Sequence, residues 1–342
     1  MAPLMRALFR RLGASLIVLV GVSMLIFAIA RVIPGDPARI ALGANATPGQ
    51  VLALRAERHL DAPVPVQYGY FLWDLAHGDL GISLYTTRPV TTDIAQFLPA
   101  TLELVIASGI LMVGLGVPLG VFAARRRHRS GDHFARLISV LCVCTPSFVW
   151  GVIFQLTFGY FWPLFPIEGR ISANMARPPT LSGFYTVDAL LSGDGRALAN
   201  SLHHLALPAL ALAMAGIGQA ARLTRANMIE TYDRPYIEMA RAYGFAARRI
   251  AQRYAFRPAF IPTLTILGLD FAAMLGNAFL VERVFVWPGL SRYGVEVILH
   301  KDLDAIVGTV LIIATMFLLV NIAVDLLVGL INPRIRVAEG AA

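Results

Sequence analysis

The stretch of sequence that decides the fold is Asp233-Arg-Pro-Tyr-Ile-Glu-Met-Ala-Arg-Ala-Tyr-Gly244, which lies between two long apolar runs. Asp233 can cap a helix by accepting hydrogen bonds from its first backbone N–H groups, and Pro235 is tolerated in a first turn. Gly244 supplies the left-handed residue with which many helices end. These signals predict one short helix. Because so short a helix is marginal alone, it is either a docking element for another protein or an interfacial helix on lipid headgroups.

The composition is that of an integral membrane protein. Of the 342 residues, 57% are hydrophobic and 15% are charged, and the mean hydropathy of +0.67 lies outside the range of a soluble domain. The net charge of +8 comes from arginines that cluster beside apolar runs, a pattern that orients membrane spans and requires no nucleic-acid partner. Cys142 and Cys144 lie in an apolar run, and the adjacent His203 and His204 point to different sides of a helix, so we expect no metal site.

Lysine usage excludes one function class. Lys301 is the only lysine in the chain, and it stands between His300 and Asp302. A Walker A loop needs a lysine directly before serine or threonine, so the chain cannot carry a P-loop of its own. The G-x-S-x-G and H-E-x-x-H motifs of hydrolases do not occur in the sequence either. We therefore expect a protein that is not an enzyme and that holds no cofactor in this chain.

Six apolar runs predict six transmembrane helices, since about 20 apolar residues cross the hydrocarbon core of a bilayer. The runs cover about residues 12–30, 99–124, 134–160, 202–223, 262–281 and 303–330. Arginines are enriched beside alternate ends of these runs, which predicts cytoplasmic N- and C-termini. The same rule places the 233–244 helix on a cytoplasmic loop between spans four and five.

The spans divide the chain into four parts. Residues 1–30 are expected to form an N-terminal transmembrane helix, 31–97 an extracytoplasmic subdomain, 98–336 a five-helix transmembrane core that includes the cytoplasmic loop 224–260, and 337–342 a C-terminal tail. A secretory signal is the competing interpretation of the first run, because Ala28-Ile-Ala30 resembles a cleavage site. The run is longer than a usual signal core, which favours a transmembrane helix.

Polar side chains inside the apolar runs are candidates for a transport pathway. Gln155 is isolated in span three, and Asp270 and Asn277 interrupt span five. Polar groups are costly in hydrocarbon, so these three residues either line a water-filled path or make polar packing contacts. Glu103 lies near the outer end of span two, where an interfacial position is favoured.

Several local patterns predict how the helices pack. Gly116-Val-Pro-Leu-Gly120 has the GxxxG spacing that permits close helix contact, and Pro146 predicts a kink in span three. Span four is rich in alanine and glycine, so we expect it at the centre of the bundle. Val286-Trp-Pro-Gly-Leu290 predicts an interfacial turn on the outer side.

With the spans and the central helix in place, the chain resembles the permease subunit of a binding-protein-dependent ABC importer. More narrowly, it is similar to the first permease subunit of the dipeptide, oligopeptide and nickel importer group. The residues that carry the resemblance run from one end of the chain to the other: Ile33-Pro-Gly-Asp-Pro37, His77-Gly-Asp-Leu-Gly-Ile-Ser83, Pro99-Ala-Thr-Leu-Glu103, Tyr236 to Gly244, Trp287-Pro-Gly-Leu290, Val324-Asp-Leu326 and Asn332-Pro-Arg-Ile-Arg336.

The resemblance implies a type I ABC importer permease fold, with the 233–244 segment as a coupling helix seated in a groove of a separate ATPase. The family motif Glu-Ala-Ala-x-x-x-Gly corresponds to Glu238-Met-Ala-Arg-Ala-Tyr-Gly244, in which Met239 replaces an alanine and Tyr243 stands where a lysine is common. By this resemblance Gly244 sets the turn and Ala240 permits close approach. The residues implied to couple to the ATPase are Tyr236, Glu238, Ala240, Arg241 and Gly244.

The resemblance also implies the partners and the location. These are a second homologous permease subunit, two cytosolic ABC ATPase subunits that bind ATP and Mg, an extracytoplasmic substrate-binding protein, and the lipid of the bacterial cytoplasmic (inner) membrane. The chain would form half of a translocation pathway for peptides or similar small solutes. Whether the solute is a dipeptide, an oligopeptide or a nickel chelate stays open, because the binding protein makes much of the selection. The alternative is an ion-coupled secondary transporter in which Asp270 and Glu103 act as a relay.

Overall fold

The computed structural model describes residues 2–32, 37–42, 46–57 and 59–331, and in these residues the protein is a bundle of helices. The β-pairing within these ranges is one isolated bridge between Ile82 and Pro89. The all-α fold class is therefore confirmed. Residues 33–36 of the first family motif, the motif at 332–336 and the 337–342 tail lie outside the described residues.

Five helical segments are long and apolar enough to cross a membrane, and a bent pair of helices provides a sixth if it is counted as one span. The segments are Arg11–Ile29, Val90–Arg125, the pair Ser130–Cys144 with Ser147–Phe161, Gly195–Tyr232, Ala247–Val284 and Leu303–Leu327. Their positions along the chain follow the six predicted apolar runs. By length and composition the structure thus accommodates the six-span topology.

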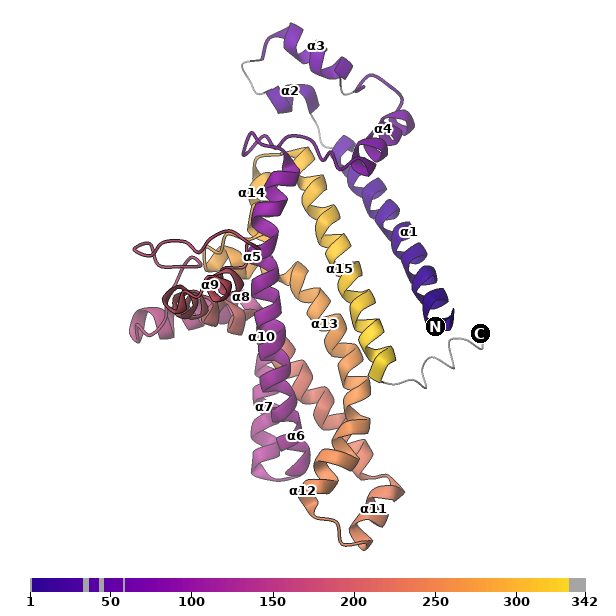
Figure 1. Ribbon diagram of the computed structural model, residues 1–342, viewed down its shortest axis with the longest axis vertical. Coiled ribbons are helices and arrows are strands. Elements are labelled where there is room, and N and C mark those ends of the chain that lie inside the picture. The colour runs from indigo at the N-terminus through magenta and orange to yellow at the C-terminus, as the bar shows by residue number, and fades with distance from the viewer. Residues whose placement is uncertain (1, 33–36, 43–45, 58, 332–342) are drawn as a thin grey trace.

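Short helices gather at the two ends of the bundle (Figure 1). At the top of the view are α2 (Pro37–Leu42), α3 (Pro48–Glu57) and α4 (Val64–Ala76), and at the bottom are α11 (Pro235–Ala242) and α12 (Ala247–Arg249). α4 packs on α1 (Ala2–Val32) through the rings of Phe27 and Tyr68, whose centroids are 5.3 Å apart. The Ser23 and Tyr68 hydroxyls share a hydrogen bond of 2.8 Å. The helices within 31–97 therefore lie at the end opposite to the 233–244 segment.

Span two begins earlier than predicted. It runs without interruption through α5 (Val90–Leu111), the π-helical η1 (Met112–Gly116) and α6 (Val117–Arg125), and it contains Pro99 in its interior. Val90 and Ile94 are buried in an apolar cluster with Leu290 and Val297, and this packing stabilises a helical turn ahead of the apolar run. The first residues of this span thus owe their helical structure to tertiary contacts.

The glycine pair at 116 and 120 brings two helices into backbone contact, as the GxxxG spacing predicts. A Cβ atom on Gly116 would lie 2.7 Å from the carbonyl oxygen of Ile217, and one on Gly120 would lie 2.5 Å from that of Ala221. Both carbonyl groups belong to α10 (Gly195–Tyr232). Larger residues at either glycine would therefore separate α6 from α10.

Span three bends far more sharply than a proline kink. α7 (Ser130–Cys144) meets α8 (Ser147–Phe154) and the π-helical η2 (Gln155–Phe161) at an angle of 105°. Thr145 has extended backbone angles, and Pro146 occupies the N-cap position of α8. Because proline disfavours a helical conformation in the residue before it, the α7 helix ends at this point and α8 starts in a new direction.

α10 lies at the centre of the bundle, as its small residues predict. In its most apolar window 72% of the residues are buried within the chain, against 11% for the α1 segment and 6% for α15 (Leu303–Ile331). Its neighbours include α5, α6, α7, α8 and α13 (Arg257–Val284). The remaining elements are α9 (Tyr185–Leu191), the π-helical η3 (Ile250–Phe256) and α14 (Leu290–Leu299). The outermost helices, α1 and α15, leave most of their apolar surface for lipid or a partner.

Candidate functional site

The predicted helix at 233–244 is present as α11, with Pro235 as its first residue. Gly244 follows the helix with a φ of +74°, the left-handed conformation that its position in the sequence predicts. The predicted cap is wrong. Asp233 ends α10, its carboxylate accepts a hydrogen bond of 3.1 Å from Arg127 Nη1, and Arg234 takes the N-cap position of α11 without a side-chain bond. The arginine on the neighbouring loop outcompetes the helix N–H groups for this carboxylate.

One face of α11 is fixed to the body of the protein. Ile237 is completely buried and Ala240 is 4% exposed, and both belong to an apolar cluster with Met228, Ile250 and Ala259. Ala240 therefore permits close approach of the chain's own helices, which differs from the external contact that the family resemblance implies for it. Its spacing from Ile237 places both residues on the same inward face.

Beside this buried face, α11 has an exposed strip that is largely apolar. Tyr236, Met239 and Tyr243 are 43%, 60% and 73% exposed, and their spacing places them on one side of the helix. Glu238 and Arg241 are exposed too, and neither belongs to an ion pair of the described residues. α11 stands at the extreme lower end of the bundle in the view (Figure 1). It thus presents an apolar ridge with free charges beside it.

A buried ion pair supports the same end of the bundle. Arg225 on α10 donates two hydrogen bonds to the carboxylate of Asp132 on α7, at 2.5 Å from Nε and 2.8 Å from Nη2. Asp132 is completely buried, and it also accepts a bond from the backbone N–H of His128. This pair and the contact between Arg127 and Asp233 tie the loop after span two to α10. The sequence offers only a weak signal for it, a single aspartate within an arginine-rich loop.

An open cavity of about 380 Å³ lies beside the bend of span three. Its walls come from the junction of α7 and α8, from α10 and from α13, and its polar lining residues are Thr145, Ser147, Gln219, Asp270 and Asn277. Asp270 is half-buried, and its Oδ2 atom has no hydrogen-bond partner in the described part of the chain. The structure therefore brings together two of the three polar residues that were singled out in the spans.

Gln155, the third polar residue, lies away from this cavity. Its Nε2 atom donates hydrogen bonds to the backbone oxygens of Ile167, at 2.7 Å, and Val284, at 2.9 Å. It thereby joins the outer loop to the end of α13. This contact is the polar packing that the sequence left open as an alternative for Gln155.

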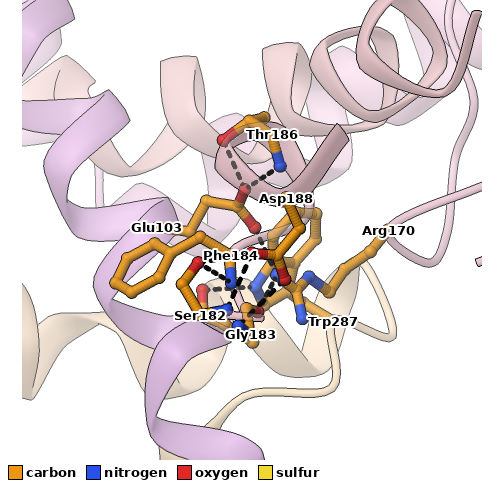
Figure 2. Close-up of polar contacts among 9 residues, drawn as sticks. Glu103, Arg170, Ser182, Gly183, Phe184, Thr186, Asp188 and Trp287 are labelled. Carbon is orange, nitrogen blue, oxygen red and sulfur yellow. Dashed lines mark hydrogen bonds and ion pairs between the residues drawn. The ribbon is translucent and has the colours of Figure 1, made fainter. Parts of the chain in front are cut away.

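A buried salt bridge fixes the loop between spans three and four, which was predicted to be an outer loop, to span two (Figure 2). Arg170 Nη2 donates to Glu103 Oε2 at 2.5 Å, and the other carboxylate oxygen accepts bonds from the backbone N–H and the hydroxyl of Thr186. Glu103 is only 5% exposed and so lies buried within the protein, and its predicted depth at the membrane boundary stays a prediction. Its partners lie far along the chain, where no local pattern could indicate them.

Two of the family motifs meet at this outer junction. Trp287 Nε1 donates to the Ala100 carbonyl at 2.9 Å, and the backbone N–H of Leu290 donates to Thr101 Oγ1 at 2.8 Å. The Thr101 hydroxyl in turn donates to Glu282 Oε1 at 2.5 Å. The predicted turn at 286–290 exists, and Trp287 is 1% exposed because its ring is buried within the chain itself. Its indole N–H has a buried carbonyl partner, which stabilises an internal position. The position of the turn at the membrane boundary stays a prediction.

The loop before α9 is closed by one carboxylate. Asp188 accepts bonds from the Ser182 hydroxyl and from the backbone N–H groups of Ser182 and Gly183, at 2.6, 2.8 and 3.0 Å (Figure 2). Burial alone would raise the pKa of the Asp188 carboxyl, but these hydrogen bonds outweigh it and hold the pKa below its ordinary value. Asp188 thus stays ionised and keeps the loop folded against Arg170.

The paired histidines also serve this loop. His203 Nε2 lies 2.7 Å from the Leu164 carbonyl oxygen, and His204 Nδ1 lies 2.9 Å from that of Glu168. Their rings hold two points of the loop to the start of α10. Among the described residues there is no group of three histidine, cysteine, aspartate or glutamate side chains arranged to hold a metal ion.

The fold and these sites define a polytopic α-helical membrane protein with an open polar cavity inside its bundle. Comparison with protein families makes the class specific. The family described as binding-protein-dependent transport system inner membrane component matches residues 116–337, and the N-terminal family of membrane components of these systems matches residues 4–105. The chain belongs to this family of transport permeases.

Curated relatives match over almost the full length of the chain. It is 39% identical over 327 residues to the probable D,D-dipeptide transport system permease protein DdpB of Escherichia coli (strain K12), covering 95% of this chain and 96% of that protein. It is 35% identical over 336 residues to the dipeptide transport system permease protein DppB of the same strain, covering 97% and 99%. The di/tripeptide transport system permease protein DppB of Pseudomonas aeruginosa (strain UCBPP-PA14) is 36% identical over 328 residues, covering 96% and 97%.

Proposed function

We propose that the chain is a permease subunit of an ATP-driven importer for peptides or similar small solutes, and that it forms half of the translocation pathway. The observation that carries this proposal is the near full-length similarity to dipeptide and D,D-dipeptide permeases. The open cavity supports it. When two subunits share one pathway, the part that each subunit contributes is open on the side that faces the other subunit. In this proposal the open cavity is that part, and Asp270 and Asn277 line the pathway.

In this proposal α11 is the coupling helix, and its exposed face docks on a cytosolic ATPase subunit. The apolar ridge of Tyr236, Met239 and Tyr243 supplies buried area for such a contact. Glu238 and Arg241 supply polar contacts beside it, and Gly244 sets the turn. Ile237 and Ala240 pack directly on the neighbouring helices, so a displacement of α11 moves these helices with it.

The proposed assembly has five further subunits or bound components. These are a second homologous permease that covers the open cavity, two ABC ATPases that bind ATP and Mg, an extracytoplasmic substrate-binding protein, and the lipid of the bacterial inner membrane. The 31–97 subdomain lies on the outer side and both termini lie in the cytoplasm. In the described residues, α11 and the helices of this subdomain are at opposite ends of the bundle, which is the arrangement that two separate partners on two sides require (Figure 1).

The alternative of an ion-coupled secondary transporter requires Glu103 to act as a relay together with Asp270, and the contacts of Glu103 argue against this role. Both carboxylate oxygens of Glu103 are engaged, one by Arg170 and the other by Thr186. A relay group needs to exchange partners during transport, and separating this pair would leave Arg170 buried without its counter-ion. Glu103 is therefore better suited to holding the outer loop than to carrying ions.

The proposal is tested by purifying the tagged protein from its native membrane in a mild detergent and identifying by mass spectrometry what accompanies it. We expect a distinct six-span permease together with one or two P-loop ATPases. A tagged permease from a known ABC importer, treated in parallel, controls for loss of subunits. Recovery of this chain alone, while the control complex survives, would overturn the proposal.

A further inference from the structure

We infer that the cavity beside the Pro146 bend favours solutes that carry a protonated amino group, and that the carboxylate of Asp270 recognises this group. The inference rests on the proposed function, because it assigns a ligand chemistry to the half pathway. It is carried by the position of Asp270 and by the composition of the cavity wall. It is also carried by the lack of an arginine, lysine or histidine side chain paired with this carboxylate in the described part of the chain.

One oxygen of the half-buried Asp270 carboxylate lacks a hydrogen-bond donor among the described residues, although the residue lines the open cavity. Oδ2 of Asp270 is buried and has no partner, and no arginine, lysine or histidine of the described residues forms an ion pair with this carboxylate. Leaving a shielded charged oxygen without a donor is unfavourable. An ammonium group brings three donors and the opposite charge, so it satisfies this oxygen better than a neutral or anionic solute does.

The other described residues of the cavity wall carry no charge that would attract or repel an ammonium group. Asp270 is the one charged residue among those that line the cavity in the described structure. Gln219 and Asn277 contribute amide groups, which suit the amide of a peptide bond, and Leu212 and Met274 contribute apolar surface that tolerates varied side chains. The cavity therefore combines one charge-specific contact with otherwise permissive walls.

Arg222 lies on α10, one turn from the cavity-lining residue Gln219. It is exposed, and its Nη2 atom donates to Gln219 Oε1 at 2.5 Å, one turn along α10 from the cavity wall. Its hydrogen bond to Gln219 leaves the Asp270 oxygen free for a ligand. It lowers the negative potential of the cavity without occupying the binding position.

The test measures how fast a cysteine in the cavity reacts with thiol reagents of opposite charge. In a background with Cys142→Ala and Cys144→Ser, Ala273→Cys places a thiol on the cavity wall one turn from Asp270. Membrane vesicles are treated with an ethylammonium or an ethylsulfonate methanethiosulfonate, the former being itself a small primary amine. For Ala273→Cys, we divide the rate of reaction with the cationic reagent by the rate with the anionic reagent. We expect this ratio to exceed the same ratio for the reference variant Ala242→Cys, on the exposed coupling helix, by roughly tenfold.

Variants at Asp270 separate the possible outcomes. Asp270→Asn should reduce the ratio at position 273 to the reference value and leave the labelling of Ala242→Cys unchanged, whereas Asp270→Glu should retain a raised ratio. A thiol at 273 that reacts with neither reagent would remove the proposed pathway, and the inference with it. A reactive thiol whose charge preference is absent, or survives Asp270→Asn, would overturn the inference alone and leave the pathway standing.

Discussion

α11 and the junction of Figure 2 are held by different kinds of contact. α11 is seated by apolar side chains such as Ile237 and Ala240, and the neighbouring part of its surface is exposed. In the junction of Figure 2, Glu103, Arg170 and Trp287 are nearly inaccessible to solvent. α11 thus presents exposed apolar side chains, whereas these three side chains are engaged within the protein.

This difference indicates separate tasks for the two ends. Apolar seating is non-directional, so the cluster beneath α11 can shift as a unit without leaving a polar group unpaired. A buried ion pair is directional, and separating it leaves charges without partners in a region that excludes water. The apolar seat of α11 is thus suited to receive a displacement, and the ion-paired junction around Glu103 to keep its geometry while the helices move.

The outer network provides the largest expected effect. Glu103→Gln leaves Arg170 buried without a counter-ion, which should destabilise the protein by about 3–5 kcal/mol. We expect a markedly lower melting temperature in detergent and faster proteolysis within residues 163–184. The control is Glu230→Gln, which removes an exposed ion pair with Arg234 and should cost less than about 1 kcal/mol. Equal melting temperatures for the two variants would contradict the comparison.

A steric test of the same junction should have a smaller effect. A Cβ atom on Gly289 would lie 2.3 Å from the Glu282 carboxylate, so Gly289→Ala should destabilise by about 1–3 kcal/mol through overpacking. Gly21→Ala in α1, where a Cβ atom meets no heavy atom within 4 Å, is the matched control and should be neutral or slightly stabilising. Thermal unfolding of both variants measures the difference, and a neutral Gly289→Ala would show that the outer end is more yielding than we argue.

The third prediction compares the same backbone strain at the two ends. Gly244 and Gly193 have φ values of +74° and +72°, and neither has a neighbour that a Cβ atom would meet within 4 Å. Each valine substitution should therefore cost a similar strain, roughly 1–2 kcal/mol. Only Gly244→Val should abolish substrate-stimulated ATP hydrolysis in reconstituted vesicles, while both variants insert normally. Loss of stimulation in both, or in neither, would remove the special role of the cytoplasmic turn.

The smallest effect on stability is expected on the outer face of α11. Replacing Met239 and Tyr243 by serine removes exposed side chains, so the free energy of unfolding should change by less than about 0.5 kcal/mol. Binding of the ATPase subunits should nevertheless weaken by tenfold or more, as measured by their retention on the tagged permease. Ile237→Ala is the counterpart on the buried face and should cost about 2–5 kcal/mol in stability. A large stability loss in the serine variant would place these side chains in the core.

Local signals in the sequence predicted the local features well. Pro235 and Gly244 bound α11 because each acts through its own backbone, and Gly116 and Gly120 indicated the contact of α6 with α10 because the spacing alone creates the groove. Asp270 and Asn277 share a cavity because they lie two helical turns apart on one span.

The features that the sequence did not predict depend on partners distant in the chain. Glu103 pairs with Arg170, and Trp287 with the carbonyl of Ala100, across separations that no window of sequence covers. Pro146 predicted a kink in span three, but the bend of 105° is much sharper, and α8 packs against the distant α10. Asp233 was predicted to cap α11, but its carboxylate accepts a hydrogen bond from Arg127, which belongs to another loop.

The measurement that tests the central claim most directly is photo-crosslinking from the exposed face of α11. Tyr243→p-benzoylphenylalanine is introduced in cells and irradiated, with the same substitution at the buried Ile237 as the control. We predict that position 243 forms an adduct with a P-loop ATPase, identified by mass spectrometry, and that position 237 links only within this chain. Adducts from position 243 with phospholipid alone would identify α11 as an interfacial helix and contradict the account.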